Sequence, residues 1–435
     1  MEFARRKYLG DLASSIGNGM VKIVTGPRRS GKSYLLFNLF VGYLRFQGVA
    51  DDHIVGLQLD KGENARYRDL DELSKYFSDR RAQDGKTQFF LIDEIQLAEP
   101  KDNPWAKGQK ITFYDVLNDF LGYPNTEIFV TGSNSRLLST DIATEFRGRG
   151  WQIPMHPLSF LEIREATPSS VSDYSLWEAY YRYGGLPACV SEADEAKKRR
   201  YLSGVFETTY LRDIADRHGL RGETALRELT SFLASSVGSL VSPNKISNAF
   251  RSREGLSTAP ATISRYISYL QDAFLISEAK RYDLKGKSFI SGASKCYFDD
   301  LGLRSAAAGF KGMDQEPHFM ENAIYNELIA RGYQVNVGAV ISNEYIGGRQ
   351  TKVPREVDFV VEDFGERCYI QSALYLPDEA KVMQEKASFK RIGDSFQKII
   401  ITKFTSGISN DPDGVVRMGL FDFFEDKEFF RRRIS

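Results

Sequence analysis

A glycine-rich loop between an apolar strand and a helix is the feature that most limits what this chain can fold into. Residues 26–33 are Gly-Pro-Arg-Arg-Ser-Gly-Lys-Ser and match the pattern G-x-x-x-x-G-K-[ST]. The loop follows an apolar strand candidate, Val21–Thr25, and opens a helix predicted over Ser33–Leu44. A glycine turn could match this pattern by chance. The agreement of strand, loop and helix instead favours a loop whose backbone amides surround phosphate oxygens.

The expected ligand of this loop is ATP with Mg²⁺. Lys32 would reach the β- and γ-phosphates, and the Ser33 hydroxyl would bind the metal ion. The predicted nucleotide-binding residues are Gly26, Pro27, Arg28, Arg29, Ser30, Gly31, Lys32, Ser33 and Tyr34.

The first third of the chain alternates short apolar segments with helical stretches. This alternation predicts an α/β fold with a parallel P-loop sheet and right-handed crossovers. The strand candidates are Val21–Thr25, Ile54–Leu59, Phe89–Ile92, Ile128–Thr131 and Trp151–Met155. Pro154 would confine the last of these to an edge or a strand end.

Two acids follow the third strand candidate. Asp93 and Glu94 come directly after Phe89–Ile92, at the end of a parallel strand where ligands bind in open α/β sheets. We expect Asp93 to hold Mg²⁺ and Glu94 to act as a general base on the attacking water. The alternative for Glu94 is a cap on the next segment.

Polar residues after the fourth and before the fifth strand candidate complete the expected site. Asn134 or Ser133 could place a polar group beside the γ-phosphate, although an ordinary polar turn fits as well. Arg149, or Arg147 near it, could complete the active site of a neighbouring subunit in a homo-oligomer. The alternative is a structural or solvated arginine.

We predict four regions along the chain. They are a P-loop domain over residues 1–157, a helical lid region over 158–220, a winged-helix-like domain over 221–294 and a C-terminal α/β domain over 295–435. The strand pair Leu275–Arg281 and Ser288–Ser291 would form the wing.

Several motifs together resemble a family of bacterial and archaeal AAA-type ATP-binding proteins that carry a C-terminal DUF4143 domain. The resemblance covers nearly the whole chain. Besides the loop at 26–33, it rests on Leu91–Gln96, Thr131–Ser135, Arg147-Gly148-Arg149, His156–Phe160, Tyr181–Pro187, Arg212-Asp213-Ile214 and Glu356–Phe359.

The resemblance implies that the C-terminal domain is similar to restriction endonucleases. Glu321 and Asp358 match the first two acids of such a nuclease site. The next strand, Tyr369–Ala373, holds neither the acid nor the lysine that metal-dependent cleavage needs. We therefore expect a degenerate domain that does not cut DNA.

A helix over Ala259–Asp272 occupies the place of a recognition helix. Ile263, Ile267 and Leu270 form its apolar stripe. The residues expected to face DNA are Arg265, Ser268 and Tyr269 on the helix and Lys280, Arg281, Lys285 and Lys287 on the wing. The alternative is a structural lid without a DNA contact.

Charge and composition exclude some classes of protein. Lys plus Arg and Asp plus Glu both number 58, so the net charge of zero gives no general attraction to nucleic acid or to an anionic membrane. No apolar run is long enough for a membrane span, and three scattered cysteines fit reduced thiols. We expect a cytoplasmic, Mg²⁺-dependent ATPase that couples hydrolysis to conformational change, with DNA as a candidate partner. A nucleotide-gated binding module with little turnover is the alternative.

Overall fold

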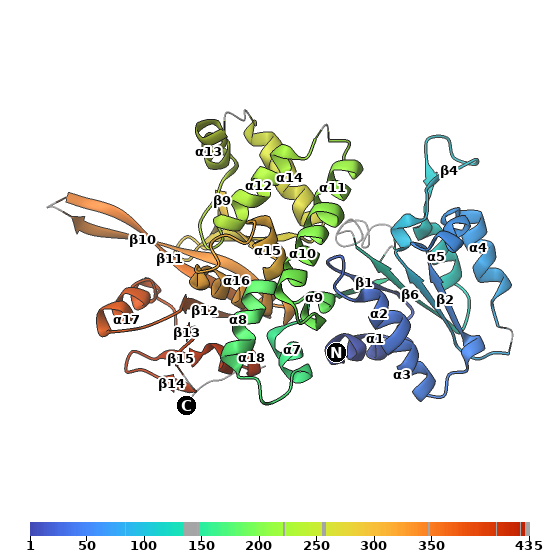
Figure 1. Cartoon of the computed structure of the whole chain (residues 1–435), viewed down its shortest axis with the longest axis horizontal. Helices are drawn as coiled ribbons and strands as arrows, with labels where there is room; N and C mark the ends of the chain where they lie inside the picture. Colours follow the sequence, from blue (N-terminus) through green and yellow to red (C-terminus); the bar gives the residue numbers. More distant parts are fainter. Residues whose placement is uncertain are drawn as a thin grey trace. The chain divides into compact units, whose positions relative to one another are not determined.

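The computed structural model describes residues 1–82, 84–133, 146, 148–220, 222–254, 258–346, 349–405, 407–426 and 428–430. At 253–254, 341–346 and 349–354 it describes the backbone alone. The chain forms two compact units (Figure 1). Unit 1 consists of Met1–Pro157 with Asp272–Phe274, and unit 2 of Leu158–Gln271 with Leu275–Ser435.

Unit 1 is built on a five-stranded parallel sheet, which confirms the predicted P-loop fold. The strands follow the order β2-β3-β6-β1-β7. Their bounds are β1 Val21–Thr25, β2 Ile54–Gln58, β3 Gln88–Asp93, β6 Thr126–Gly132 and β7 Gly150–Pro154. Every residue of β1 and β3 is buried, since helices cover both faces, and this explains their continuous apolar sequences. Pro154 is the last residue of an edge strand, where its missing N–H costs no ladder bond.

Two cores, one on each face of this sheet, hold the layers together. On β3, Phe89 and Leu91 pack into one core, while Phe90 and Ile92 pack into the other. The first core also takes in α1 (Arg6–Ser14) and the helical run α2–η1–α3 from Lys32 to Phe46. The second takes in α4 (Leu70–Asp79) and α5 (Phe113–Leu121). The remaining short elements of unit 1 are η2 Asp51–His53, η3 Gly62–Arg68, η4 Ile95–Leu97 and the strand pair β4 Lys101–Asp102 with β5 Lys110–Ile111.

Unit 2 begins with helices. They are α7 Phe160–Ala166, α8 Asp173–Tyr183, α9 Pro187–Ser191, α10 Glu195–Gly204, η6 Val205–Leu211, α11 Arg212–Arg217, α12 Thr224–Ser235, α13 Pro243–Glu254 and α14 Pro260–Asp272. Later helices are α15 Leu301–Ala307, α16 Glu316–Ala330, α17 Glu379–Lys386, η7 Phe389–Arg391 and α18 Leu420–Glu425. No helix in the described ranges combines the length and the apolar character needed to cross a bilayer.

An eight-stranded mixed sheet forms the other half of unit 2. Its order is β14-β15-β13-β12-β11-β10-β8-β9. The strands are β8 Ile276–Asp283, β9 Ser288–Phe298, β10 Gln334–Ile346, β11 Arg349–Asp363, β12 Glu366–Ala373, β13 Gln397–Thr402, β14 Ile408–Asn410 and β15 Val415–Gly419.

The domain boundary predicted between residues 294 and 295 is wrong, because it falls inside β9. The pair β8–β9, expected as a separate wing, is the edge of the large sheet, since β8 pairs in parallel with β10. Local sequence patterns do not reveal a parallel pairing between strands so far apart in the chain.

The Gly-Gly-Leu-Pro sequence after α8 has a structural explanation. The buried Asp300 carboxylate accepts hydrogen bonds from the backbone N–H groups of Gly185 (2.7 Å) and Leu303 (2.9 Å). A Cβ at Gly184 would lie 2.3 Å from Asp300 Oδ1, and one at Gly185 would lie 2.1 Å from the Leu158 carbonyl oxygen. Both positions therefore need glycine.

Candidate nucleotide site

The glycine-rich loop has a conformation that only glycine supports at its two ends. Gly26 has a φ of +143°, and a Cβ there would lie 1.9 Å from the Met155 carbonyl oxygen. Gly31, with a φ of +97°, immediately precedes the helix that starts at Lys32. The loop thus joins the carboxyl end of β1 to a helix N-terminus, the arrangement that binds phosphate.

Lys32 is buried beneath this loop. Its Nζ donates to the carbonyl oxygens of Gly26 (2.9 Å) and Pro27 (2.8 Å). Burial lowers the pKa of Lys32 to about 8, although the charges of Glu94 and Asp93 act in the opposite direction. The ammonium therefore lies close to both acids predicted from the sequence.

Asp93 ends β3 with one carboxylate oxygen available. Its Oδ1 accepts a hydrogen bond from the Thr131 hydroxyl on β6. Burial raises the pKa of Asp93, while hydrogen bonds from Thr131 and Ser33 lower it. The buried Oδ2 receives no well-aligned hydrogen bond within the described part of the chain. The Ser33 hydroxyl and the Asp93 carboxylate therefore lie close together, and such a pair fits Mg²⁺, which binds to proteins through one or two oxygen ligands and takes phosphate oxygens for the rest.

Glu94 is fixed by contacts at both carboxylate oxygens. Oε1 accepts from the Ser133 hydroxyl (2.5 Å), and Oε2 accepts from the Gln96 side-chain amide. The backbone of Glu94 has a φ of +53°, and its N–H donates to Thr131 Oγ1 (3.0 Å). Thr131 thus links Asp93 and Glu94. Thr131 and Gln96 received no role in the sequence prediction, although Thr131 is the penultimate residue of β6, the strand next to β3.

The other predicted site residues either lie farther from Lys32 and Asp93 or fall outside the described residues. Asn134 and Arg147 lie outside the described residues. The side chain of Arg149 is exposed, and its backbone accepts from Val21 N–H (2.8 Å) where β7 joins β1. Tyr34 is 43% exposed and donates to Glu2 Oε1 (3.1 Å). Within the loop, Ser30 is buried while Arg29 is exposed.

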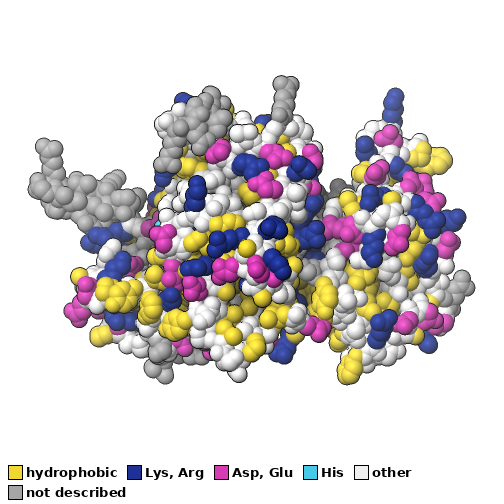
Figure 2. Space-filling model, viewed as in Figure 1, with side chains coloured by type: hydrophobic (Ala, Val, Ile, Leu, Met, Phe, Trp, Pro, Cys, Tyr) yellow, Lys and Arg dark blue, Asp and Glu magenta, His cyan; other side chains and the backbone are white. Residues whose placement is uncertain are grey.

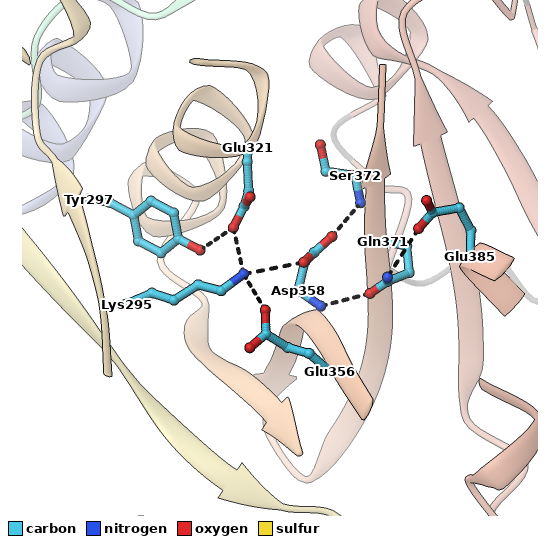
Figure 3. A network of polar contacts seen from close by, with 8 residues as sticks. All are labelled: Lys295, Tyr297, Glu321, Glu356, Asp358, Gln371, Ser372 and Glu385. Atoms are coloured by element: carbon cyan, nitrogen blue, oxygen red, sulfur yellow. Dashed lines mark hydrogen bonds and ion pairs between the residues drawn. The ribbon is translucent and has the colours of Figure 1, made fainter. Parts of the chain in front are cut away.

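A second group of charged residues lies in unit 2 around Lys295 of β9 (Figure 3). Lys295 Nζ contacts Glu321 Oε1 (2.8 Å), Glu356 Oε1 (2.6 Å) and Asp358 Oδ1 (3.3 Å). We call these four residues the Lys295 cluster. Burial lowers the pKa of Lys295, but the three carboxylates outweigh it, so the net shift is upward. Burial also raises the pKa of Asp358.

The Lys295 cluster corrects one part of the sequence interpretation. Glu321 and Asp358 do come together as expected, and β12 supplies Gln371, whose Oε1 accepts from Asp358 N–H (2.7 Å). The missing lysine has a counterpart in space, Lys295, which comes from β9. Glu356 could have been anticipated, since residues two apart on a strand share a face.

The predicted recognition helix differs from expectation at Tyr269, and Ile267 of its predicted apolar stripe is only half-buried. Ile263 and Leu270 are buried as predicted. Tyr269, expected to face DNA, stacks on His218 with ring centroids 3.5 Å apart and an interplanar angle of 8°. Lys280, Lys285 and Lys287 are exposed. On the face seen in Figure 2, basic and acidic side chains are interspersed.

Two known proteins are similar to this chain over most of its length. An uncharacterized protein of Haemophilus influenzae is 36% identical over 403 residues, which cover 92% of this chain and 93% of that protein. The chain belongs to the same family as that protein. A second relative, uncharacterized protein MJ1544 of Methanocaldococcus jannaschii, is 28% identical over 389 residues, covering 86% and 79% of the two chains.

Two family models describe parts of this family member. Residues 18–164 match an AAA domain, which supports a P-loop ATPase. Residues 174–314 match a domain of unknown function, DUF8612. The expected DUF4143 domain is therefore wrong, because the motifs that suggested it, such as Gly-Gly-Leu-Pro, lie within a differently defined domain.

Solved structures give only loose superpositions. Cdc6p from Pyrobaculum aerophilum superposes with a TM-score of 0.28 and 13% identity over 72% of this chain and 94% of that one. The Aeropyrum pernix Orc1 protein, solved in complex with DNA, gives a TM-score of 0.27 and 15% identity over 73% and 95%.

Proposed function

We propose that this protein binds ATP with Mg²⁺ and hydrolyses it, coupling turnover to a conformational change. The observation that carries the proposal is the convergence of Lys32, Ser33 and Asp93 at the carboxyl ends of β1 and β3. The buried Asp93 Oδ2 is the strongest single support, because within the described residues it receives no well-aligned hydrogen bond, and burying such an oxygen is costly unless a ligand compensates for it.

Each residue has a distinct role in this proposal. Lys32 would release its hydrogen bonds to the Gly26 and Pro27 carbonyl oxygens and bind the β- and γ-phosphates instead. The backbone amides of the loop would bind the remaining phosphate oxygens. Ser33 and Asp93 would hold Mg²⁺, which neutralises phosphate charge when bound. Glu94 would accept the proton of the attacking water once it leaves Ser133 or Gln96. Asn134 is proposed to sense the γ-phosphate.

Steady-state phosphate release tests this proposal. Wild type should hydrolyse ATP only with Mg²⁺, Lys32→Ala should lose nucleotide binding, and Glu94→Gln should bind ATP but lose most turnover. Glu99→Gln, on an exposed residue beyond the short η4 helix, is a matched control. Full activity in Glu94→Gln would contradict the general-base assignment. No measurable affinity of wild type for ATP would contradict the whole proposal.

A nucleotide-gated binding module is the second candidate. The observation that favours it is that both Glu94 oxygens already accept a hydrogen bond from the protein, and these bonds compete with a substrate water for the proposed base. Such a protein would bind ATP tightly and hydrolyse it slowly. Single-turnover measurement separates the two candidates: a slow hydrolysis step that no added DNA accelerates would favour the module.

We also propose that Arg149 completes a neighbour's site in a homo-oligomer. Its exposed side chain and its position beside β1 support this role. Mixing Arg149→Ala with Glu94→Gln should restore activity, because each variant supplies what the other lacks. An inactive mixture, with both variants oligomeric by light scattering, would reject a function in trans.

DNA is the proposed partner of unit 2. The exposed lysines Lys280, Lys285 and Lys287 on β8–β9 support phosphate contacts. Binding should weaken steeply with added salt, since each phosphate contact releases a counterion. Replacing the three lysines by alanine should flatten this salt dependence; an unchanged slope would exclude them.

We propose that the Lys295 cluster does not cut DNA. The Lys295 ammonium already contacts all three carboxylates, so its three N–H donors are matched by three acceptors. Incubation of plasmid DNA with Mg²⁺ or Mn²⁺ should leave it intact. Cleavage that Asp358→Ala abolishes would overturn this view.

A further inference from the structure

The edge of the large sheet in unit 2 borders a groove. β9 is the last strand of that sheet, and six of its consecutive residues, Phe289–Ser294, line one side. The opposite side is α14, through Ser264, Ile267, Ser268 and Gln271. The groove has a volume of about 510 Å³ and is open to solvent. An exposed strand edge beside a helix is the arrangement that accepts an added strand.

The backbone of β9 is unusually available along this groove. β8 pairs Lys280 with Ser294 and Arg281 with Ile290, so residues 291–293 of β9 have no partner in the register. Gly292, with a φ of +101°, lies in this bulge. In the described ranges, no backbone hydrogen bond outside the β8–β9 pair reaches residues 288–293. Unpaired strand edges attract further strands, and proteins normally cover them.

The chain itself shows that this edge accepts antiparallel pairing. Val241 and Ser294 exchange two backbone hydrogen bonds, Val241 N–H to Ser294 O (2.9 Å) and Ser294 N–H to Val241 O (3.0 Å). The chain then turns away into α13 at Pro243. The pairing of Val241 with Ser294 is therefore a single bridge. Among the described residues, no backbone hydrogen bond reaches the side of β9 that faces away from β8 between Phe289 and Ala293.

The lining of the groove favours a peptide over a nucleic acid. Of the three lysines proposed above to contact DNA, only Lys280 lines the groove, and Glu278 balances its charge, so the lining has no net positive charge. Binding of single-stranded nucleic acid depends on a basic groove. Ile267 and Ile290 offer apolar contacts, while serine hydroxyls and Gln271 supply polar ones. The Gln271 side chain also bonds to Glu278 (3.4 Å), which ties the helix to the sheet.

We propose that this groove binds an extended, uncharged peptide segment of a partner protein, which adds to β9 as a further strand. Backbone hydrogen bonds to β9 would supply affinity, and small apolar side chains would pack against Ile267 and Ile290. This site is separate from the proposed nucleotide site and does not depend on ATP hydrolysis.

Selection from a phage-displayed library of random dodecapeptides on the full chain tests the proposal. The selected peptides should lose at least about tenfold in affinity, measured by fluorescence anisotropy, on Ile267→Arg and on Ser291→Pro, which removes an edge N–H. Ala261→Arg, on an exposed part of α14, should bind normally. Two versions of a selected peptide, N-methylated at the odd or at the even positions, should behave differently. The version that loses the N–H groups facing β9 should not bind, and the other should bind normally. All variants should keep wild-type melting temperatures.

Three results would overturn the proposal. The first is that the library yields no binding peptide, and the second is that Ile267→Arg binds the selected peptides as tightly as wild type. The third is that a single-stranded oligodeoxythymidine displaces the peptides and itself binds more weakly to Ile267→Arg. The last result would assign the groove to nucleic acid.

Discussion

The hydroxyl of Ser133 donates a 2.5 Å hydrogen bond to the Glu94 carboxylate, across from β6 to the end of β3. Gln96 takes the other oxygen of the same carboxylate. Each carboxylate oxygen keeps a second lone pair, but these two hydrogen bonds compete with a substrate water for the proposed base. We therefore expect the residues that hold Glu94 to influence the rate of hydrolysis.

Loss of the Gln96 amide should speed hydrolysis. A hydrogen bond to a charged group contributes about 1.5–3 kcal/mol, and about 1.4 kcal/mol corresponds to tenfold in rate. We expect Gln96→Ala to raise the single-turnover rate at saturating ATP by up to about tenfold, with nucleotide affinity unchanged. Gln152→Ala, on an exposed residue of β7, is the control. A slower Gln96→Ala protein would show that Gln96 helps to position the base.

The affinity for ATP should depend on pH through Lys32. Burial lowers the pKa of Lys32 to about 8, so the amine becomes neutral as pH rises above that value. The triphosphate needs the charged form, and binding must then take up a proton. Affinity for a non-hydrolysable ATP analogue should fall by about tenfold per pH unit above pH 8. Calorimetry in buffers of different ionisation enthalpy measures both effects.

Lys32→Arg provides the control for this pH dependence, because a guanidinium stays charged throughout the range. Its affinity should be flat with pH, whatever its absolute value. A slope equal to that of wild type would place the titrating group elsewhere.

Two glycine-to-alanine substitutions should differ in sign. The Cβ of Gly185→Ala would lie 2.1 Å from the Leu158 carbonyl oxygen, so backbone must move, and we expect a loss of about 3 kcal/mol or more in the free energy of unfolding. Gly204 ends α10 with nothing within 4 Å of its ideal Cβ. Gly204→Ala should gain about 0.5–1 kcal/mol. Urea unfolding measures both, and equal effects would contradict the packing described for Gly185.

The Lys295 cluster should respond strongly to loss of its cation. Lys295→Met leaves buried carboxylates uncompensated, and removal of one partner from a buried ion pair costs about 3–5 kcal/mol. Burial raises the pKa of Asp358, so the folded protein protonates this carboxylate more readily than the unfolded chain does. A carboxyl group whose pKa is raised by folding stabilises the folded state at low pH. This stabilisation is lost as pH rises through the pKa that the group has in the folded protein.

The deficit of Lys295→Met should therefore be large near neutral pH and shrink in mild acid, as followed by urea unfolding at each pH. Lys285→Met, on the exposed β8–β9 turn, should change stability little. A deficit independent of pH would indicate lost packing and not lost charge.

The sequence predicted unit 1 well because its signals are local. Apolar strands buried on both faces, a loop whose glycines have positive φ and acids at a strand end all lie within short stretches of chain. The sequence therefore predicted that Lys32, Ser33, Asp93 and Glu94 lie close together, as they do in the fold. It did not identify Thr131 or Gln96, since their roles follow from hydrogen bonds between neighbouring strands and within a turn.

Unit 2 was harder because its decisive contacts are distant in sequence. β8 and β9 have the pattern of an independent hairpin, and only the pairing of β8 with β10 makes them part of a larger sheet. The same pairing carries Lys295 to Glu321 and Asp358. Tyr269 lies on the exposed side of a regular helix, and the stacking on His218 follows from the path of an earlier segment.

The bond between Asp300 and the Gly185 amide spans 115 positions of the chain. During synthesis, Gly185 leaves the ribosome well before Asp300 has been added. The turn between α8 and α9 cannot acquire its acceptor until then, so nascent chains that end before Asp300 would lack this tertiary bond. Unit 2 would thus complete its folding late in translation, whereas every strand of the unit 1 sheet has by then been made.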